Sequence, residues 1–343
     1  MKRSPSKGSR LTASSDRPAE PAPPNARSNS FVLAVMGPTA SGKTALAEAL
    51  ARRIGGEVVS ADSMQVYRGM DIGTAKPPLA ERTVPYHCLD LVEPGESYSA
   101  ARYQADARYA IDDILTRGLT PVVAGGTGLY VRAALDDLTF PYGDTDAEPR
   151  RRYETLAEEL GPEGLHELLA ERDPASAALI HPNNVRRTVR ALEMHDEGVS
   201  YAEQAAGFSR RKSEYPTLFL GLDIERDELY ERIDERVDGM LAKGLVDEVR
   251  VLLERGYGDA MTATQAIGYK ELVGVVEGRA ELGKAAEEIK RATRRYAKRQ
   301  LTWFRADPRI VWLDVTRSSA VRTLSEALEL VESFERGRGP APV

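Results

Sequence analysis

The sequence predicts an α/β protein with a parallel sheet core and an inserted all-helical domain. The first observation is an apolar run, residues 31–36, that leads at once into a glycine-rich turn and a helix. The second is the recurrence of short apolar runs between helical segments up to residue 140 and again from residue 217. The third is the stretch between them, which is helical and lacks β-branched runs. We expect a tail at 1–30, a core at 31–140 and 213–343, and a helical insertion at 141–212.

Composition allows a large core and argues against several classes of protein. The chain has 343 residues and a formal net charge of −6, so any nucleic-acid contact needs a local basic cluster. The single cysteine, Cys88, excludes an internal disulfide, and the four histidines without cysteine partners argue against a zinc site. The first 30 residues lack an apolar segment of signal-peptide length, and no run of about 18 apolar residues occurs. We expect a disordered tail, no membrane span, and a cytoplasmic monomer.

A phosphate-binding loop opens the core. Residues 37–44, GPTASGKT, match G-x-x-x-x-G-K-[ST] between a strand and a helix over 45–54. The glycines let backbone N–H groups turn inward, Lys43 adds a positive charge, and the Thr44 hydroxyl is placed to bind Mg²⁺. The alternative is a glycine-rich turn without a ligand. The candidate phosphate-binding residues are Gly37, Pro38, Thr39, Ala40, Ser41, Gly42, Lys43 and Thr44.

A carboxylate follows the second predicted strand. Residues 57–61 are short and β-branched, and they lead into Asp62, Ser63, Met64 and Gln65. A turn after a parallel strand lies at the carboxyl edge of the sheet, where ligands bind in open α/β folds. Asp62 is therefore a candidate for chemistry, and the alternative is a helix N-cap. The polar segment 67–77 reads as a loop over this site.

The next strand ends in glycines where a nucleotide hydrolase usually has an acid. A helix over 99–117 precedes the strand at 120–124, which is followed by Gly125, Gly126 and Thr127. An NTP-hydrolysing enzyme usually places an Asp at such a strand end to hold magnesium. Here we expect the glycines to let a ligand approach the backbone and Thr127 to bond it. The alternative is a tight turn.

Two further regions carry arginines at helical spacing. In the insertion, helices are predicted over 150–160, 164–171 and 184–196, and the last of these carries Arg186, Arg187 and Arg190 on one face. These side chains are candidates for phosphate contacts, with solvated surface arginines as the alternative. After a strand at 217–222, helices are expected over 226–241 and 246–255. The first of these carries Arg232 and Arg236 four residues apart.

The most basic helix lies near the end of the chain. Residues 265–270 form a loop-to-helix junction, and a helix over 290–305 follows before a strand at 310–313 and a helix at 318–334. At 100° per residue, half of its surface is filled by Lys290, Arg291, Arg294, Arg295, Lys298 and Arg299, without an acid. The other half carries Ile289, Tyr296, Trp303 and Phe304. We expect the basic stripe to contact a polyanion, with a solvated face as the alternative.

Six motifs, in order, resemble those of the bacterial tRNA dimethylallyltransferases. They are GPTASGKT at 37–44, ADSMQVYRGMDIGTAKP at 61–77, GGTGLY at 125–130, HPNNVRRTVRALE at 181–193, QAIGYKE at 265–271 and KRQLTWFR at 298–305. The resemblance runs from about residue 31 to residue 313. It implies a P-loop NTPase-like core with a helical insertion. It also implies transfer of a dimethylallyl group from its diphosphate to the exocyclic amine (N6) of the adenosine just 3′ of the anticodon in certain tRNAs.

The resemblance also implies roles for individual residues. The P-loop and Arg236 would bind the diphosphate with Mg²⁺, Asp62 would be the general base, and Thr127 would lie in the channel and contact the tRNA. Two departures concern RNA contacts: Arg186 stands where many relatives have Gln, and Lys270 where many have Arg. The expected tRNA-binding residues are Asp62, Ser63, Met64, Gln65, Arg186, Arg187, Arg190, Gln265, Tyr269, Lys270, Arg294, Lys298, Arg299 and Arg305.

Three other functions remain open from the sequence. An adenylate isopentenyltransferase would use a free nucleotide, and it would need neither the basic helix nor the insertion. A P-loop kinase or NTPase is weakened by the missing acid after Val123. An RNA-binding module with an inactive P-loop would leave Asp62 and Lys43 without a role.

Overall fold

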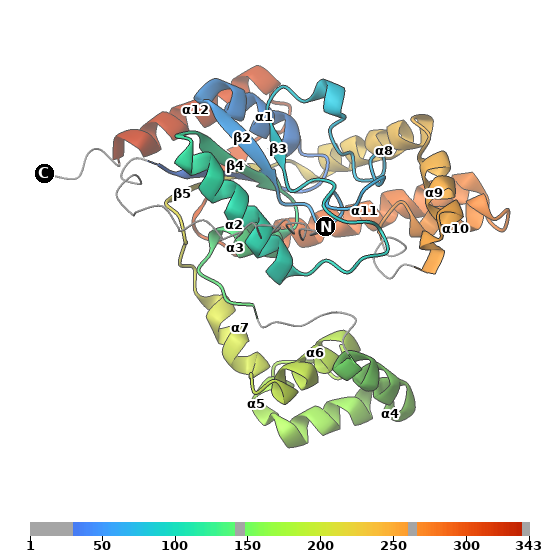
Figure 1. The fold of residues 1–343 in the computed structure, drawn as a ribbon. Coiled ribbons are helices and arrows are strands. Elements are labelled where there is room, and N and C mark those ends of the chain that lie inside the picture. The colour runs from blue at the N-terminus through green and yellow to red at the C-terminus, as the bar shows by residue number, and fades with distance from the viewer. Residues whose placement is uncertain (1–29, 141–147, 260–265, 338–343) are drawn as a thin grey trace, which may run out of the picture.

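The structure is a computed structural model that describes residues 30–140, 148–259 and 266–337. The predicted tail lies outside the described residues except for Ser30, and Gln265 also lies outside them. The described residues form an α/β part and a smaller helical part beside it (Figure 1). The limits that we assign to the two parts remain a prediction.

A six-stranded, fully parallel sheet organises the α/β part. Its strands have the order β3-β2-β4-β1-β5-β6. They are β1 (Val32–Met36), β2 (Gly56–Ser60), β3 (Tyr86–His87), β4 (Thr120–Gly125), β5 (Thr217–Asp223) and β6 (Ile310–Asp314). The five predicted strands are confirmed. The edge strand β3 was missed because two residues are too short to show a pattern.

Helices cover both faces of the sheet because β1 is apolar on both sides. Its residues Leu33 and Val35 pack with α1 (Lys43–Ile54) and α12 (Ala320–Gly337). The alternating residues Val32, Ala34 and Met36 face a second cluster that includes residues of α2 (Ala100–Thr116) and α3 (Gly128–Leu135). Every residue of β1 is buried, which explains its uninterrupted apolar sequence.

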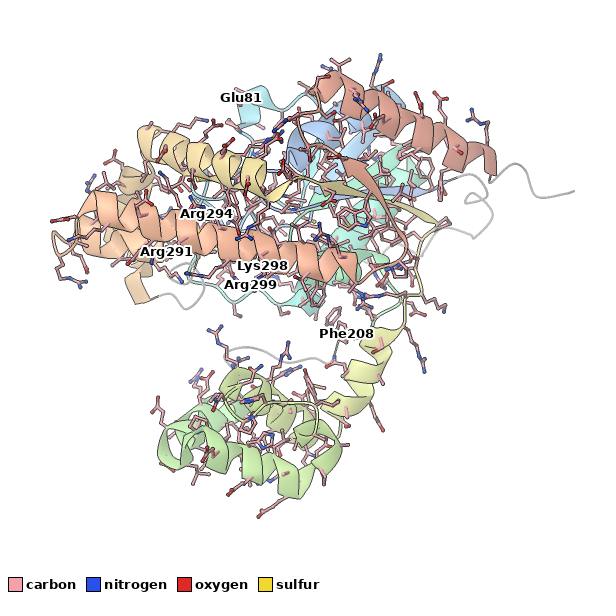
Figure 2. The ribbon with its side chains drawn as sticks, turned by 180° about the vertical axis from the view of Figure 1, so that it is seen from behind. Glu81, Phe208, Arg291, Arg294, Lys298 and Arg299 are labelled. Atoms are coloured by element: carbon pink, nitrogen blue, oxygen red, sulfur yellow. The ribbon has the colours of Figure 1, made fainter. Side chains whose placement is uncertain are left out.

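Four helices near one end of the sheet complete the α/β part. They are α8 (Arg226–Ala242), α9 (Leu245–Glu254), α10 (Lys270–Val276) and α11 (Leu282–Arg305). The helix α11 packs against α8 and α10 and is the longest unbroken helix among the described residues (Figure 2). It begins eight residues before the predicted start at 290, with Ala285 and Ile289 extending its buried face. The short α10 was predicted only as a junction.

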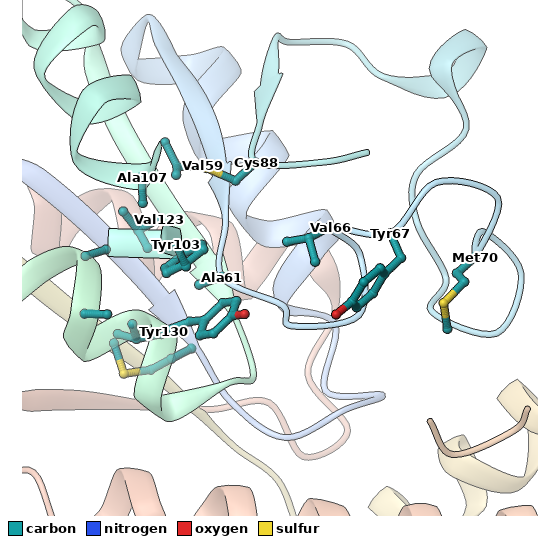
Figure 3. Close-up of a cluster of buried hydrophobic side chains, with 14 of the residues drawn as sticks. Val59, Ala61, Val66, Tyr67, Met70, Cys88, Tyr103, Ala107, Val123 and Tyr130 are labelled. Atoms are coloured by element: carbon teal, nitrogen blue, oxygen red, sulfur yellow. The ribbon is translucent and has the colours of Figure 1, made fainter. Parts of the chain in front are cut away.

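Two stacked tyrosines join the second face of the sheet to the site edge. The Tyr103 and Tyr130 rings lie 3.9 Å apart between centroids, and the Tyr103 hydroxyl donates to the Ser60 carbonyl at 3.0 Å. Figure 3 shows Tyr103 and Tyr130 beside Ala61 and Val123, with Val66, Tyr67 and Met70 extending the cluster under the loop that follows β2. The loop at 67–77 therefore contributes buried side chains to the core.

The helical part has a core of its own. It consists of α4 (Glu148–Arg172), α5 (Pro174–Ala177), α6 (Val185–Asp196) and α7 (Tyr201–Ser209). Gly161, with φ 70° and ψ 174°, breaks α4 into the two predicted segments, and the apolar residues include Tyr153, Leu165 and Leu192. The short α5 and the half-exposed α7 were not predicted.

A buried arginine attaches the helical part to the sheet. The guanidinium of Arg132, on α3, donates to the carbonyls of Phe208 at 2.7 Å and Arg210 at 3.0 Å, at the end of α7. Its Nε donates to the buried Asp136 carboxylate at 2.6 Å. One guanidinium thus satisfies carbonyls at the helix end and anchors α7 to α3. Across the described residues, none of the helices combines the length and apolarity needed to cross a bilayer.

Candidate functional site

Three loops meet at the carboxyl edge of the sheet because β2, β4 and β1 are neighbours. They are the P-loop after β1, the turn at Asp62 after β2, and the GGTG turn after β4. Backbone bonds join the last two: Ala61 N donates to Ala124 O at 2.8 Å, and Thr127 N donates to Ala61 O at 3.2 Å. The prediction that these motifs share one edge is confirmed.

The P-loop adopts a conformation that requires glycine at one position. Gly42 caps the start of α1 with φ 89°, and Ala40 has φ 65°, a conformation that is uncommon for a residue with a side chain. The helix begins at Lys43, two residues earlier than predicted, which leaves Thr44 exposed in its first turn. The loop therefore presents a helix N-terminus and a free hydroxyl to one site.

Lys43 is the cation of this loop. Burial and the charge of Arg236 lower the pKa of Lys43 to about 8, against the opposing effect of Asp62. The Nζ atom donates to the Pro38 carbonyl at 3.3 Å. Burial likewise lowers the pKa of Arg236, whose Nη2 is 3.5 Å from the Thr74 carbonyl. The charges of Lys43 and Arg236 disfavour each other, so a bound anion would stabilise both.

A buried glutamine holds the P-loop in place, and the sequence analysis missed it. Gln300, on α11, accepts from Thr39 N at 2.8 Å and donates from Nε2 to Gly126 O at 2.9 Å. Its side-chain amide thus connects the P-loop to the GGTG turn. The sequence shows residue 300 only as part of a basic helix, because its partner Thr39 lies 261 positions earlier in the chain.

The glycines after β4 make room for other parts of the protein. A Cβ at Gly125 would lie 2.1 Å from Ala61 O, and one at Gly126 would lie 2.2 Å from Gln300 Nε2. The absence of side chains at these glycines is therefore explained by contacts within the protein, and approach of a ligand to their backbone stays a prediction. Thr127 accepts from Ser63 N at 3.0 Å through its hydroxyl, which fixes the turn that carries Asp62.

Asp62 lies at the wall of a pocket at this edge of the sheet. No helix follows it among residues 63–77, so the N-cap alternative is wrong; its Oδ1 accepts from Met64 N at 2.9 Å within a turn. This pocket, the first pocket, has a volume of about 500 Å³, and Asp62 is the only acid among the described residues that line it. Burial, with Asp62 nearby, also raises the pKa of Tyr296 to about 12.

The first pocket has a cationic lining and an apolar lining. The cationic residues are Arg236, Lys270, Arg295 and Arg299. The apolar residues come from α8, α11 and the segment before α10, and they are Val237, Met240, Ala266, Ile267, Ile289 and Ala292. The pocket thus suits a ligand that has both an anionic group and a hydrocarbon chain. Sequence reasoning missed the apolar lining, whose residues are scattered over three segments.

One carboxylate ties two walls of the first pocket together. Glu248, on α9, accepts from the backbone N–H groups of Asp71, Ile72 and Gly73 at 2.8–3.1 Å. It also accepts from the Tyr269 hydroxyl at 2.6 Å. Burial and the Glu248 charge raise the pKa of Tyr269 above its ordinary value. Both Gly73 and Tyr269 line the pocket, so Glu248 sets their separation.

The predicted basic stripe on α11 is covered along one side by the fold. Acids of α8 pair with two of its residues: Lys290 lies 2.8 Å from Asp238, and Arg294 pairs with Asp234. The basic surface is therefore narrower than the sequence predicts, because α8 packs against that side of the helix. The remaining residues of the stripe, Arg291, Arg295, Lys298 and Arg299, are exposed, and Figure 2 shows Arg291, Lys298 and Arg299 on α11.

Of the other residues predicted to contact RNA, some are buried or paired within the protein and some line the first pocket. The side-chain amide of Gln65 is buried, accepting from Ser60 Oγ at 2.9 Å and donating to Thr74 O at 3.2 Å, so it supports the loop from inside. Arg305 lies 2.9 Å from Asp223 at the surface. Met64, Tyr269 and Lys270 line the first pocket.

The three arginines of the helical part lie apart from the first pocket. Arg186 and Arg187 are exposed on α6, whereas Arg190 approaches Glu193 to 3.4 Å. Arg232 does not join Arg236 at the site, because it bonds Glu228 at 2.5 Å on the same helix.

Comparisons with known proteins agree with this geometry. The family model described as IPP transferase matches residues 65–307, and the model described as isopentenyl transferase matches residues 30–83. The tRNA dimethylallyltransferase of Geobacillus thermodenitrificans is 50% identical over 287 residues, which are 83% of this chain and 90% of that protein.

Solved structures show the same similarity. The tRNA isopentenylpyrophosphate transferase of Bacillus halodurans is 42% identical, with a TM-score of 0.66 over 90% of this chain and 97% of that one. A eukaryotic dimethylallyltransferase described as acting on tRNA is 30% identical, with a TM-score of 0.72 over 89% of this chain and 80% of that one. From its sequence, its fold and the edge at which its motifs meet, the chain belongs to the tRNA dimethylallyltransferase family.

Proposed function

We propose that this protein transfers a dimethylallyl group from dimethylallyl diphosphate to the exocyclic N6 amine of the adenosine 3′ of a tRNA anticodon, releasing diphosphate. Membership of the family supports transfer to tRNA. The observation that supports the chemistry is Asp62, the one carboxylate among the described residues that line a pocket with four cations beside the P-loop. The acceptor base, the site residues and the metal go beyond family membership.

The diphosphate is bound by the P-loop and becomes the leaving group. The backbone amides of residues 37–44, Lys43 and Arg236 stabilise the negative charge that the diphosphate gains as the carbon–oxygen bond breaks. Because the charges of Lys43 and Arg236 disfavour each other, an anion bound between them relieves that cost. Gln300 fixes the position of the P-loop through its bond to Thr39 N.

Asp62 accepts the proton of the attacking amine. An adenine amine is a poor nucleophile because its lone pair is delocalised into the ring, so a carboxylate that takes its proton as the new bond forms lowers the barrier. The Met64 N–H bond to Oδ1 and the Thr127 bond to Ser63 fix the turn that carries this carboxylate. Thr127 thus acts through the position of Asp62 in this proposal.

The five-carbon chain lies along the apolar lining of the first pocket. Val237 and Met240 on α8 and Ile289 and Ala292 on α11 belong to this lining. Burial of each methylene there contributes about 0.8 kcal/mol to binding. The same lining keeps water away from the allylic carbon as positive charge develops on it.

A magnesium ion fits the site if the diphosphate supplies most of its ligands. Thr44, in the first turn of α1, has an exposed side chain. The described residues contain no cluster of three His, Cys, Asp or Glu side chains that would hold an ion alone. Magnesium in phosphate sites is commonly bound by one or two protein oxygens plus phosphates. When bound, it would neutralise charge on the leaving diphosphate.

Substitution of the acceptor base tests the proposal. Labelled dimethylallyl diphosphate, magnesium and an unmodified anticodon stem-loop are incubated with the protein. A matched stem-loop carries inosine, which lacks the exocyclic amine, in place of the adenosine 3′ of the anticodon. We expect label on the adenosine RNA alone. Equal labelling of both RNAs would contradict the proposed acceptor.

A further inference from the structure

A second pocket lies on the other side of Arg299, between α11 and the attachment of the helical part. Its volume is about 480 Å³. The described residues that line it are Arg132, Arg211, Lys298, Arg299, Thr302, Trp303 and Ala306. Arg132 belongs to α3 and Arg211 follows α7. The remaining residues belong to the last turns of α11, except Ala306, which follows that helix. Figure 2 shows Lys298, Arg299 and Phe208 of α7 in this region.

The lining of the second pocket is positively charged. None of the described lining residues is acidic. Arg132 is committed to Asp136 and to the end of α7, whereas the nearest acid to Arg211 is Asp307, 3.9 Å away. Burial, and next the charge of Arg132, lower the pKa of Arg211. Lys298 and Arg299 are exposed beside it. This arrangement favours an anion, because each cation is near others of the same sign.

A fixed aromatic ring borders the same pocket. Trp303 is 43% exposed although it is among the largest apolar side chains of the protein. A Cβ at Gly128 would lie 2.1 Å from the indole, so the glycine at the start of α3 lets one edge of the ring pack against the backbone. An exposed indole held in place among cations is the combination that binds a nucleotide, with the base stacked and the phosphate paired.

The second pocket is adjacent to the site of transfer. Arg299 lines both pockets, so the pocket that contains Asp62 and the pocket that contains Trp303 adjoin at this side chain. An RNA strand that places one base in the first pocket has its next nucleotide within reach of the second. A base that reacts has to leave its stack, and its neighbour then needs a new stacking partner.

We propose that the second pocket binds one nucleotide of the RNA, adjacent to the reacting adenosine, with its base on Trp303 and its phosphate on Arg211, Lys298 and Arg299. The proposal rests on the proposed function for the identity of the RNA. It assigns a role in holding the substrate to Trp303 and Arg211, neither of which is among the tRNA-binding residues expected from the sequence.

Tryptophan fluorescence tests the stacking directly. The chain has two tryptophans, Trp303 and Trp312, and the second lies on the edge strand β6. In a Trp312→Phe variant, tRNA should quench the remaining emission as a base stacks on Trp303. In a Trp303→Phe variant, the emission of Trp312 should not respond. Saturating tRNA that leaves the Trp312→Phe emission unchanged would overturn the proposal.

Binding measurements separate this proposal from the proposed function. Trp303→Ala should weaken tRNA binding about 5- to 150-fold, Trp303→Phe should retain most of the affinity, and the affinity for dimethylallyl diphosphate should not change. Lys298→Gln should reduce the salt dependence of binding by about one unit of slope, whereas Lys284→Gln, exposed at the start of the same helix, should not.

The two ideas can fail independently. If the wild-type protein modifies tRNA and Trp303→Ala binds it as tightly as wild type, the nucleotide site is wrong and the proposed function stands. If tRNA quenches Trp303 but never receives the dimethylallyl group, the nucleotide site stands and the proposed function is wrong.

Discussion

The two pockets that share Arg299 are nearly equal in volume, about 500 and 480 Å³, but they differ in what lines them. The described residues that line the first include one carboxylate, four cations and an apolar group from α8, α11 and the segment before α10. The second has four cations and an indole, and no acid among its described lining residues. A proton acceptor and a hydrocarbon surface suit bond formation, whereas cations and an aromatic ring suit the holding of RNA. Substitutions in the two pockets should therefore change different measured quantities.

The largest difference between the effect on transfer and the effect on tRNA binding is expected from Asp62→Ala. Loss of a general base lowers turnover by about two to four orders of magnitude. The affinity for tRNA should hardly change, because most of that affinity comes from phosphate contacts elsewhere. Single-turnover transfer and filter binding on the same preparation measure the two quantities. An unchanged transfer rate would remove Asp62 from the role of base.

The next largest effect is expected from substitution of Glu248, which ties two walls of the first pocket together. Glu248→Ala removes the acceptor of three backbone N–H groups and of the Tyr269 hydroxyl, so the free energy of unfolding should fall by about 1–3 kcal/mol and kcat/KM should fall with it. Urea unfolding and steady-state kinetics measure these effects. Glu254→Ala, exposed on the same helix, is the matched control. Equal changes in unfolding free energy and in kcat/KM for the two variants would show that Glu248 does not tie the two walls of the pocket together.

A rise in pH should weaken the binding of dimethylallyl diphosphate through Lys43. Lys43 has a pKa lowered to about 8 in the free protein, so it carries its charge below that pH and loses it above. Bound diphosphate favours the charged form, so the affinity for dimethylallyl diphosphate should decline by up to about tenfold per unit as the pH rises above 8. Calorimetric titration with wild type and Lys43→Met measures it. A decline that survives in Lys43→Met would assign the titration to another group.

The smallest effect compares two arginines of one helix. Arg299→Gln should reduce the salt dependence of tRNA binding by about one unit of slope, because Arg299 lines both pockets. Arg294→Gln should leave the slope near its wild-type value, because its guanidinium pairs with Asp234 and lies over the Tyr230 ring. Binding isotherms over a range of salt concentrations measure both. Equal slopes for the two variants would contradict the division of the stripe into a covered side and an exposed side.

The sequence predicted the parts of this molecule that are local. The strand before Gly37, the match at residues 37–44 and the turn at Asp62 each depend on neighbouring residues, and the structure confirms where they lie. The order of the strands then brings Asp62 to the edge that also carries the P-loop, as parallel strands require.

What the sequence missed depends on contacts between distant segments. Gln300 meets Thr39 across 261 residues, and Glu248 meets Ile72 across 176, so no spacing rule could reveal either. The extent of the basic stripe on α11 was overestimated for the same reason. Helical periodicity identifies a basic face, but only the packing of α8 shows that Asp234 covers part of it.

The most direct test offers the protein its competing ligands side by side. Labelled dimethylallyl diphosphate and magnesium are supplied with either unmodified tRNA or AMP, and ATP hydrolysis is followed in a parallel reaction. The account predicts that tRNA is labelled, that AMP is not, and that ATP is hydrolysed no faster than without protein. Rapid hydrolysis of ATP with no label on tRNA, or equal labelling of AMP, would contradict it.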